Sequence, residues 1–264
     1  MLLAIDVGNT NIAFGLYDPR VPAPPERTGN HWAHHWRIRT VPDKMPDEYA
    51  VLFRSLLRDQ GLSLEDVTRV VLSSVVPALT TTLSEMFERQ TPAELLTVGP
   101  GVRTGLRIRT DNPAQVGADL VANAVAAHAR FQGNCIVVDF GTALTFTAVA
   151  KNGDLLGVAI APGLRAAAGA LASNTAQLPR VRLTPPPAAI GRNTVHSIQS
   201  GVVFGYIGLV EALIRRMRTE LGGDALAIAT GGLARVIAPL SQEFASIEPW
   251  LTLDGLRLIA ERNP

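Results

Sequence analysis

The sequence has little cysteine, no excess of charge of either sign, no basic leader and no long apolar run. A single cysteine, Cys135, excludes an internal disulfide and indicates a reducing compartment. Basic and acidic side chains number 24 and 23, and this net charge of +1 argues against a general nucleic-acid binder. Apolar residues make up 47% of the 264 residues and charged residues 18%, which is typical of a chain with a substantial buried core.

The N-terminus, "MLLAIDVGNT", carries no basic leader, and its apolar run breaks at Asp6, so we expect no signal peptide. We find no apolar stretch long enough to cross a membrane. These absences together predict a soluble cytoplasmic protein that binds neither nucleic acid nor a membrane.

Strand-like and helix-like segments alternate along the chain. Residues 2–17 predict strand, turn and strand, and residues 135–163 predict three strands with turns between them. The segment "NPAQVGADLVANAVAAHARFQG" predicts a helix in which Pro113 takes an early position and Gly133 marks the end. Interleaved strands and helices predict an α/β protein.

One supersecondary unit occurs twice. "LLAIDVGNTNIAFGLY" and "CIVVDFGTALTFTAVA" share an apolar strand, an aspartate, one residue, a glycine, a small polar residue and a second strand-like run. Their aspartates are Asp6 and Asp139. Such a repeat predicts two related halves that face each other across a cleft.

The repeated turns suit the binding of a nucleotide triphosphate. A tight glycine turn presents backbone N–H groups to phosphate, and an aspartate at a strand end can hold a hydrated metal ion. Asn9, Thr10 and Thr142 add side-chain donors, and a third turn at Gly231-Gly232 is suited to the nucleoside. One such motif alone is most often an ordinary hairpin turn, but two copies with the third turn favour a nucleotide site.

These motifs resemble the type III pantothenate kinases, of the superfamily that holds acetate kinase, sugar kinases, Hsp70 and actin. The similarity covers nearly the whole chain and includes "IDVGNTNIAFGLYD", "DNPAQVGAD", "VDFGTALTF", "IGRNTVHSIQSG" and "TLDGLRLIAERN". It implies two ribonuclease-H-like half-domains, 1–114 and 115–264, with mixed sheets flanked by helices and an ATP cleft between them. It also implies phosphorylation of pantothenate to 4'-phosphopantothenate, the first step of coenzyme A biosynthesis.

The resemblance assigns a role to each motif. Asp6 is expected to face Mg²⁺ through water, and Asp139 to bind K⁺ or NH₄⁺. Asp119 is expected to be the base on the pantothenate hydroxyl. The residues implied in ATP binding are Asp6, Val7, Gly8, Asn9, Thr10, Asn11, Ile12, Thr142, Gly231 and Gly232. Those implied in substrate binding are Thr110, Gly117, Ala118, Asp119, Leu120 and Thr194, the last from the partner subunit of a homodimer whose substrate sites lie at the interface.

Asp119 has two possible roles when only its helix is considered. Gln115 and Asn123 lie four residues to either side of it, so all three are expected on one polar helix face. That stripe suits either a solvent-facing surface or an ionised base, because phosphoryl transfer needs a group that accepts the hydroxyl proton. The family pattern favours the base.

The sequence departs from the family at the acceptor side of the site. Leu120 replaces the family arginine that follows Asp119, Thr110 replaces a tyrosine, and Thr147 replaces an acid. Loss of a guanidinium removes a strong contact with a carboxylate substrate. The arginines of the preceding segment that could compensate are Arg103, Arg107 and Arg109.

Two alternatives therefore stay open beside pantothenate phosphorylation. One is the same kinase scaffold with another small alcohol as its acceptor, and the other is a catalytically weak regulatory paralogue. A histidine cluster at His31, His34 and His35 is interpreted as the polar edge of a loop, since no matching carboxylate or cysteine set accompanies it.

Overall fold

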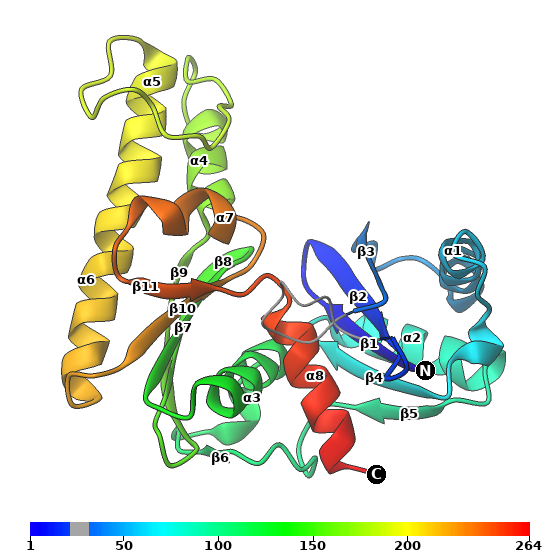
Figure 1. Ribbon diagram of the computed structural model, residues 1–264. Helices are drawn as coiled ribbons and strands as arrows, with labels where there is room; N and C mark the ends of the chain where they lie inside the picture. Colours follow the sequence, from blue (N-terminus) through cyan, green and yellow to red (C-terminus); the bar gives the residue numbers. More distant parts are fainter. Residues whose placement is uncertain (22–31) are drawn as a thin grey trace. The chain divides into compact units, whose positions relative to one another are not determined.

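The computed structural model describes residues 1–21 and 32–264, which form two compact units (Figure 1). The first unit contains Met1–Gly105, Asn112–Ala126 and Thr252–Pro264, and the second contains Leu106–Asp111 and Ala127–Leu251. We predicted a single boundary at residues 114/115. That boundary stays a prediction. Most of helix α3 (Ala118–Phe131) and nearly all of the C-terminal helix α8 (Leu251–Arg262) belong to the first unit.

The first unit is built on a five-stranded mixed sheet with the order β3-β2-β1-β4-β5. Its strands are β1 (Leu2–Val7), β2 (Asn11–Tyr17), β3 (His34–Arg39), β4 (Arg69–Ser74) and β5 (Glu94–Thr97). β1 pairs antiparallel with β2 and parallel with β4. Besides α8 and the start of α3, the unit holds helices α1 (Pro46–Arg58) and α2 (Pro77–Gln90) and the 3-10 turns Leu64–Asp66 and Pro113–Gln115.

Helix α1 shows how local sequence sets an element of this unit. Pro46 occupies the first turn, where a missing N–H costs nothing, and the Glu48 side chain accepts a hydrogen bond of 2.9 Å from the backbone N–H of Met45. Phe53 and Leu57 lie on one face and are fully buried. They join the strand residues, including Phe14, in the core of the first unit.

The second unit is built on a six-stranded mixed sheet with the order β11-β10-β7-β8-β9-β6. Its strands are β6 (Arg107–Ile108), β7 (Cys135–Phe140), β8 (Ala143–Val149), β9 (Asp154–Pro162), β10 (Leu226–Thr230) and β11 (Phe244–Ile247). Its helices are α4 (Leu164–Ser173), α5 (Thr194–Gln199), α6 (Gly205–Glu220) and α7 (Ala234–Ile237), with a π-helical segment at Ser200–Phe204 and a 3-10 turn at Ala238–Leu240.

The two sheets repeat one topology. In each sheet, the strand that carries the aspartate, β1 or β7, forms an antiparallel hairpin with the strand that follows it. A parallel strand flanks β1 or β7 on its other side, which gives β2-β1-β4 in the first sheet and β8-β7-β10 in the second. The full orders β3-β2-β1-β4-β5 and β9-β8-β7-β10-β11 correspond strand for strand, and β6 is an addition at the edge. This correspondence confirms the predicted fold class of two related halves with mixed sheets flanked by helices.

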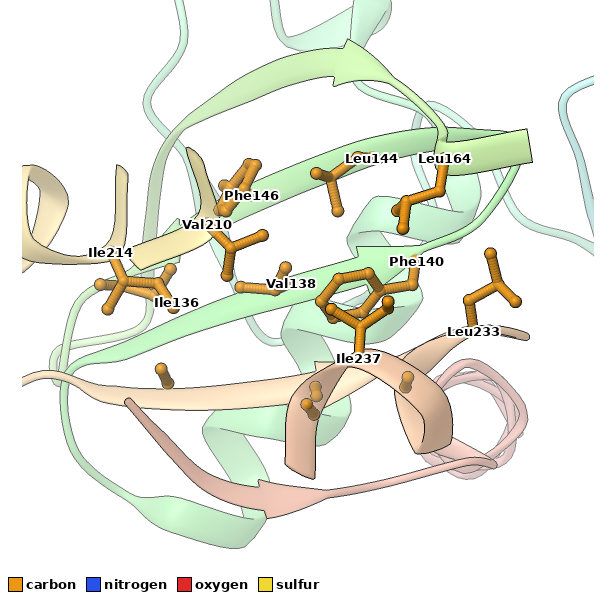
Figure 2. Packing of buried hydrophobic residues seen from close by; sticks show 14 of the residues in the cluster. Ile136, Val138, Phe140, Leu144, Phe146, Leu164, Val210, Ile214, Leu233 and Ile237 are labelled. Carbon is orange, nitrogen blue, oxygen red and sulfur yellow. The ribbon is translucent and has the colours of Figure 1, made fainter. Parts of the chain in front are cut away.

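One face of the second sheet is covered by helices α4, α6 and α7 (Figure 2). Ile136, Val138 and Phe140 alternate along β7 toward this face, as the two-residue period of a strand requires. Val210 and Ile214 of α6 are fully buried against them. The intervening residues of β7, among them Asp139, therefore lie on the opposite face.

The helical run Thr194–Glu220 is long and apolar. It joins α5, the π-helical segment and α6 into 27 residues, and an 18-residue window of it reaches a mean hydropathy of 1.5. By length and composition this run could cross a membrane, although we predicted no such stretch. The core helix of a soluble protein meets the same criteria, and Val203, Val210 and Ile214 of this run are fully buried in the second unit.

Candidate active site

The first glycine turn connects β1 to β2 and is held by backbone and side-chain hydrogen bonds. The N–H of Gly8 donates to the carbonyl of Asn11 over 3.0 Å, and the hydroxyl of Thr40 donates to the carbonyl of Gly8 over 2.6 Å. At the end of β1, the hydroxyl of Ser73 donates to Asp6 Oδ1 over 3.3 Å. The turn is therefore fixed before a ligand arrives.

Side chains of this turn divide into core and surface groups. Val7 and Ile12 are fully buried, so the predicted contact of these two residues with ATP is possible only through their backbone. Asn9, Thr10 and Asn11 are exposed. These three side chains face solvent, while Asp6 is half-buried near the end of β1.

The second turn connects β7 to β8 in the other unit. Asp139 is the next-to-last residue of β7 and pairs in register with Thr145 of β8, while Gly141 and Thr142 are exposed at the tip. The hydroxyl oxygen of Thr145 is buried and has no hydrogen-bond partner in the part of the chain that the structure describes. No sequence motif singles out Thr145, because only the strand register places it beside Asp139.

Two further glycines touch the second turn. Gly231 follows β10, has φ of +91°, and leaves so little room that a Cβ there would overlap Oδ1 of Asp139. Gly163 follows β9, and a Cβ there would overlap the carbonyl oxygen of Thr142. Both positions require glycine because the chains approach more closely than any side chain permits. The predicted third turn thus contacts Asp139, whereas the contact made by Gly163 was not predicted.

Asp119 lies in the first turn of α3 and not in the middle of a longer helix. We predicted a helix from about Pro113, but Pro113–Gln115 form a separate 3-10 turn, and α3 begins at Ala118. The N–H of Leu120 donates to Asp119 Oδ1 over 2.8 Å. Burial raises the pKa of Asp119 above its ordinary value, and this hydrogen bond opposes the shift only in part.

Gly117 gives the Asp119 carboxylate its place. A Cβ at Gly117 would lie 2.5 Å from Asp119 Oδ1, well inside an ordinary contact. The backbone carbonyl of Gly117 also accepts the N–H of Val121 over 3.1 Å, which is a bond of the first helical turn. Gly117 therefore lies directly before the helix and leaves space for the Asp119 carboxylate.

The polar stripe predicted around Asp119 is wrong. Gln115 lies in the preceding 3-10 turn and is exposed. Asn123 is only 1% exposed, and its Oδ1 accepts a hydrogen bond of 2.8 Å from the hydroxyl of Thr252 in α8. The α3 face that Asp119 and Asn123 share faces the protein interior, where Asn123 forms a hydrogen bond between α3 and α8.

The residues that replace the family pattern are largely buried. Leu120 is 8% exposed, Thr147 is 1% exposed, and the hydroxyl of Thr110 is buried without a hydrogen-bond partner among residues 1–21 and 32–264. An arginine at position 120 would need a charged partner in an apolar setting. The apolar side chain of Leu120 needs no such partner.

The arginines named as substitutes have structural partners. Arg107 Nε donates to Asp154 Oδ1 over 2.6 Å, and Arg109 Nε lies 3.5 Å from the same oxygen. Burial raises the pKa of Asp154, but hydrogen bonds from Arg107 and Asn152 and the nearby guanidinium charges outweigh it and leave this pKa lowered. Both guanidiniums are more than half exposed, so they can still meet an anion. The backbone of Arg103 is tied to Asn263.

Thr194 begins α5 and is exposed. Asn193 caps this helix by accepting the N–H of His196 over 2.9 Å. Two apolar side chains close to Thr194 in sequence are exposed, Ile190 at 84% and Val195 at 42%.

No group of three or more His, Cys, Asp or Glu side chains is arranged to hold a metal ion in residues 1–21 and 32–264. His34 and His35 lie in β3, where the ring of His34 stacks on Trp36. His31 lies outside the described residues.

Solved structures share this fold at low sequence identity. A conserved putative Baf family transcriptional activator from Campylobacter jejuni is 17% identical, with a TM-score of 0.59 over 99% of this chain and 98% of its own. A putative N-acetylmannosamine kinase from Listeria monocytogenes is 11% identical, with a TM-score of 0.52 over 100% and 99%. With the repeated sheets and their glycine turns, these likenesses define the class as a fold that is shared with sugar kinases.

The sequence itself identifies the family within that class. The model of type III pantothenate kinases matches residues 2–216. A type III pantothenate kinase of Moorella thermoacetica is 48% identical over 263 residues, which cover 100% of both chains. The chain belongs to the type III pantothenate kinase family.

Proposed function

We propose that this protein transfers the γ-phosphate of ATP to the hydroxyl of pantothenate, which yields ADP and 4'-phosphopantothenate and opens coenzyme A biosynthesis. In the step, Asp119 accepts the hydroxyl proton while the hydroxyl oxygen attacks the γ-phosphorus and the bond to ADP breaks. The observation that carries the proposal is the half-buried Asp119 carboxylate, whose pKa is raised, in a chain of this family. A raised pKa makes a carboxylate a better proton acceptor while it stays ionised at neutral pH.

ATP use follows from membership of a kinase family, and we assign its binding to the glycine turns. In the first turn, the backbone of Asp6 to Ile12 and the exposed side chains of Asn9 and Thr10 would contact phosphate. Thr142 would contact phosphate from the second turn, and Gly231-Gly232 would receive the nucleoside. That ATP lies between the two halves stays a prediction.

Mg²⁺ would be held mainly by the phosphates of the nucleotide, with Asp6 contributing through water. Mg²⁺ usually keeps several waters and takes only one or two protein carboxylates beside substrate phosphates. The half-buried Asp6 at the end of β1 suits this arrangement, because it lies directly before the first glycine turn. The ion would neutralise charge that develops on the transferred phosphoryl group.

A monovalent cation would bind at Asp139. The donor set fits, because the carboxylate of Asp139 and the buried hydroxyl of Thr145 belong to residues that lie opposite each other in the β7–β8 ladder. Oxygen donors of this kind suit K⁺ or NH₄⁺, and the added positive charge would offset repulsion among the ATP phosphates.

The acceptor would be bound beside Asp119 by the backbone of Gly117 and Ala118, by Thr110 and Leu120, and by Thr194 of a second copy. The exposure of Thr194 and of the apolar side chains Ile190 and Val195 supports a homodimer at this end of α5. The substrate carboxylate would then meet Arg109, whose guanidinium is 56% exposed and makes only a 3.5 Å contact with Asp154. We place the protein in the cytoplasm, where ATP is available and where the lone buried Cys135 stays reduced.

The test is ATP turnover with a panel of small hydroxy acids that includes pantothenate. We expect pantothenate to be the best acceptor, and Asp119→Asn to lower kcat by about 10²- to 10⁴-fold while ATP still binds. A much better rate with another acceptor would show a rebuilt pocket on the same kinase. ATP binding without turnover of any acceptor would indicate the regulatory paralogue, and an active Asp119→Asn variant would refute the assigned base.

A further inference from the structure

Helix α8 carries charged side chains that the kinase chemistry does not use. Asp254 and Arg257 are each only 9% exposed. The indole N–H of Trp32 donates to Asp254 Oδ1 over 2.9 Å, and the guanidinium of Arg257 lies 5.2 Å from the ring centroid of Tyr17 at the end of β2. Burial of charge is costly unless it is paired, so these contacts hold one face of α8 at a fixed place against the first sheet.

The C-terminal end of α8 is attached to the same sheet. Arg69, which begins β4, donates from Nη1 to the carbonyl of Ala260 over 2.8 Å and from Nη2 to the carbonyl of Asn263. These acceptors lie at the helix end, where backbone carbonyls lack helical partners. Contacts at both ends of α8 therefore leave it little freedom to slide or rotate on the sheet.

The side of α8 that carries Thr252 and Gly255 contacts α3, the helix beside it in Figure 1. The contacts on α3 lie one turn beyond Asp119. The hydroxyl of Thr252 donates to Oδ1 of the buried Asn123 over 2.8 Å. A Cβ at Gly255 would overlap the carbonyl oxygen of Ala122, so the two helix backbones touch at this point. Ala122 and Asn123 are three and four residues after Asp119, so they lie on the same face of α3 one turn further along.

We propose that α8 is a positioning element for the catalytic base. Thr252 and Gly255 set the rotation and axial position of α3 relative to the first sheet, which carries Asp6 and the first glycine turn. The inference rests on the proposed role of Asp119. It matters because a misplacement of about 1 Å at a reacting group can cost about 100-fold in rate.

Thr252→Val tests the positioning role with little change in shape. Valine matches threonine in size but cannot donate to Asn123. We expect kcat to fall about tenfold while KM for ATP stays the same. Loss of this one hydrogen bond should shift the base by less than about 1 Å, so the rate should fall by less than the 100-fold that a full shift can cost. Thr252→Ser keeps the hydroxyl and should restore kcat.

Thr91→Val is the matched control. Thr91 lies in the first unit like Thr252, and its hydroxyl likewise donates a hydrogen bond, to the carbonyl of Leu64 over 3.3 Å. The two valine variants should show similar losses in thermal stability, measured by calorimetry, but only Thr252→Val should lose turnover at a temperature where all variants are folded. Equal kcat for Thr252→Val and wild type would overturn the proposal.

A double-mutant cycle with Asp119→Asn distinguishes this inference from the proposed function. If Thr252 acts through Asp119, then Thr252→Val should cause no further loss of kcat in the Asp119→Asn background. If the kcat losses of the two single variants multiply in the double variant, then Thr252 does not act through Asp119. That result would refute the positioning role but not the proposed function. Wild-type turnover by the single variant Asp119→Asn would refute the base, and with it this role, before the cycle is completed.

Discussion

Gly117→Ala should displace Asp119, the base that we propose, while the fold is kept. A Cβ at this position would lie 2.5 Å from Asp119 Oδ1, whereas an ordinary contact begins at 3.4 Å, so the carboxylate must move by roughly 0.9 Å. The next neighbour, Val75 Cγ1, would be 3.6 Å away and is undisturbed. The only atoms that must give way are those of one flexible side chain.

The kinetic consequence follows from the size of this shift. A displacement near 1 Å can cost about 100-fold in rate, so we expect kcat to fall by about 10- to 100-fold. KM for ATP should stay the same, because no part of the first glycine turn is touched. The free energy of unfolding should fall by about 1 kcal/mol, since alanine caps the start of a helix less well than glycine.

Steady-state assays coupled to ADP release, with ATP and pantothenate each varied at saturation of the other, measure this outcome. Gly99→Ala is the control, because a Cβ at Gly99 has no neighbour within 4 Å among the described residues. Wild-type kcat in Gly117→Ala would refute the idea that Gly117 makes room for the base. A raised KM for pantothenate at unchanged kcat would mean that the methyl group blocks the acceptor instead.

Two further predictions concern the charged groups of the site. Turnover should be higher in K⁺ than in Na⁺ at matched ionic strength, and Thr145→Val should raise the K⁺ concentration needed for the half-maximal rate. Equal rates in both salts would refute the proposed cation site at Asp139. Because the folded-state pKa of Asp119 is raised, its protonated form favours folding, and that stability is lost as pH rises through this pKa. Asp119→Asn should therefore raise the melting temperature at pH 7, with a difference that shrinks as pH falls below the raised pKa, and activity of the wild type should decline over the same acid range. A melting temperature of Asp119→Asn that is lower at pH 7 would contradict the pKa shift.

Local patterns were sufficient to predict the repeated sheets. The two strand–aspartate–glycine units of the sequence became the β1–β2 and β7–β8 hairpins, with Asp6 and Asp139 at matching strand ends. This works because strand alternation and glycine turns are encoded within a few residues of each other. The short strands β6 and β11 were not predicted, since each depends on pairing with a distant neighbour.

The surroundings of Asp119 could not be predicted from the sequence, because they too depend on contacts between residues that are distant in sequence. We predicted Asn123 in a polar stripe around Asp119, because its partner Thr252 lies 129 residues away and cannot be identified from the local sequence. A polar residue on an apolar helix can face water or another helix, and only the tertiary contact decides between them. The same holds for Thr145, which lies beside Asp139 only through the strand register.

The contacts around Asp119 show a compromise between stability and chemistry. Burial disfavours its ionised form, yet a base must be ionised, so the first turn of α3 offsets part of the cost through the N–H of Leu120 and the positive end of the helix dipole. Full compensation would lower the pKa and weaken the base. A partly compensated carboxylate retains its basicity only while its surroundings hold it in place, and here glycine at 117 and the contact of α8 with α3 supply that constraint. Substitutions at these positions should therefore affect turnover more than they affect folding.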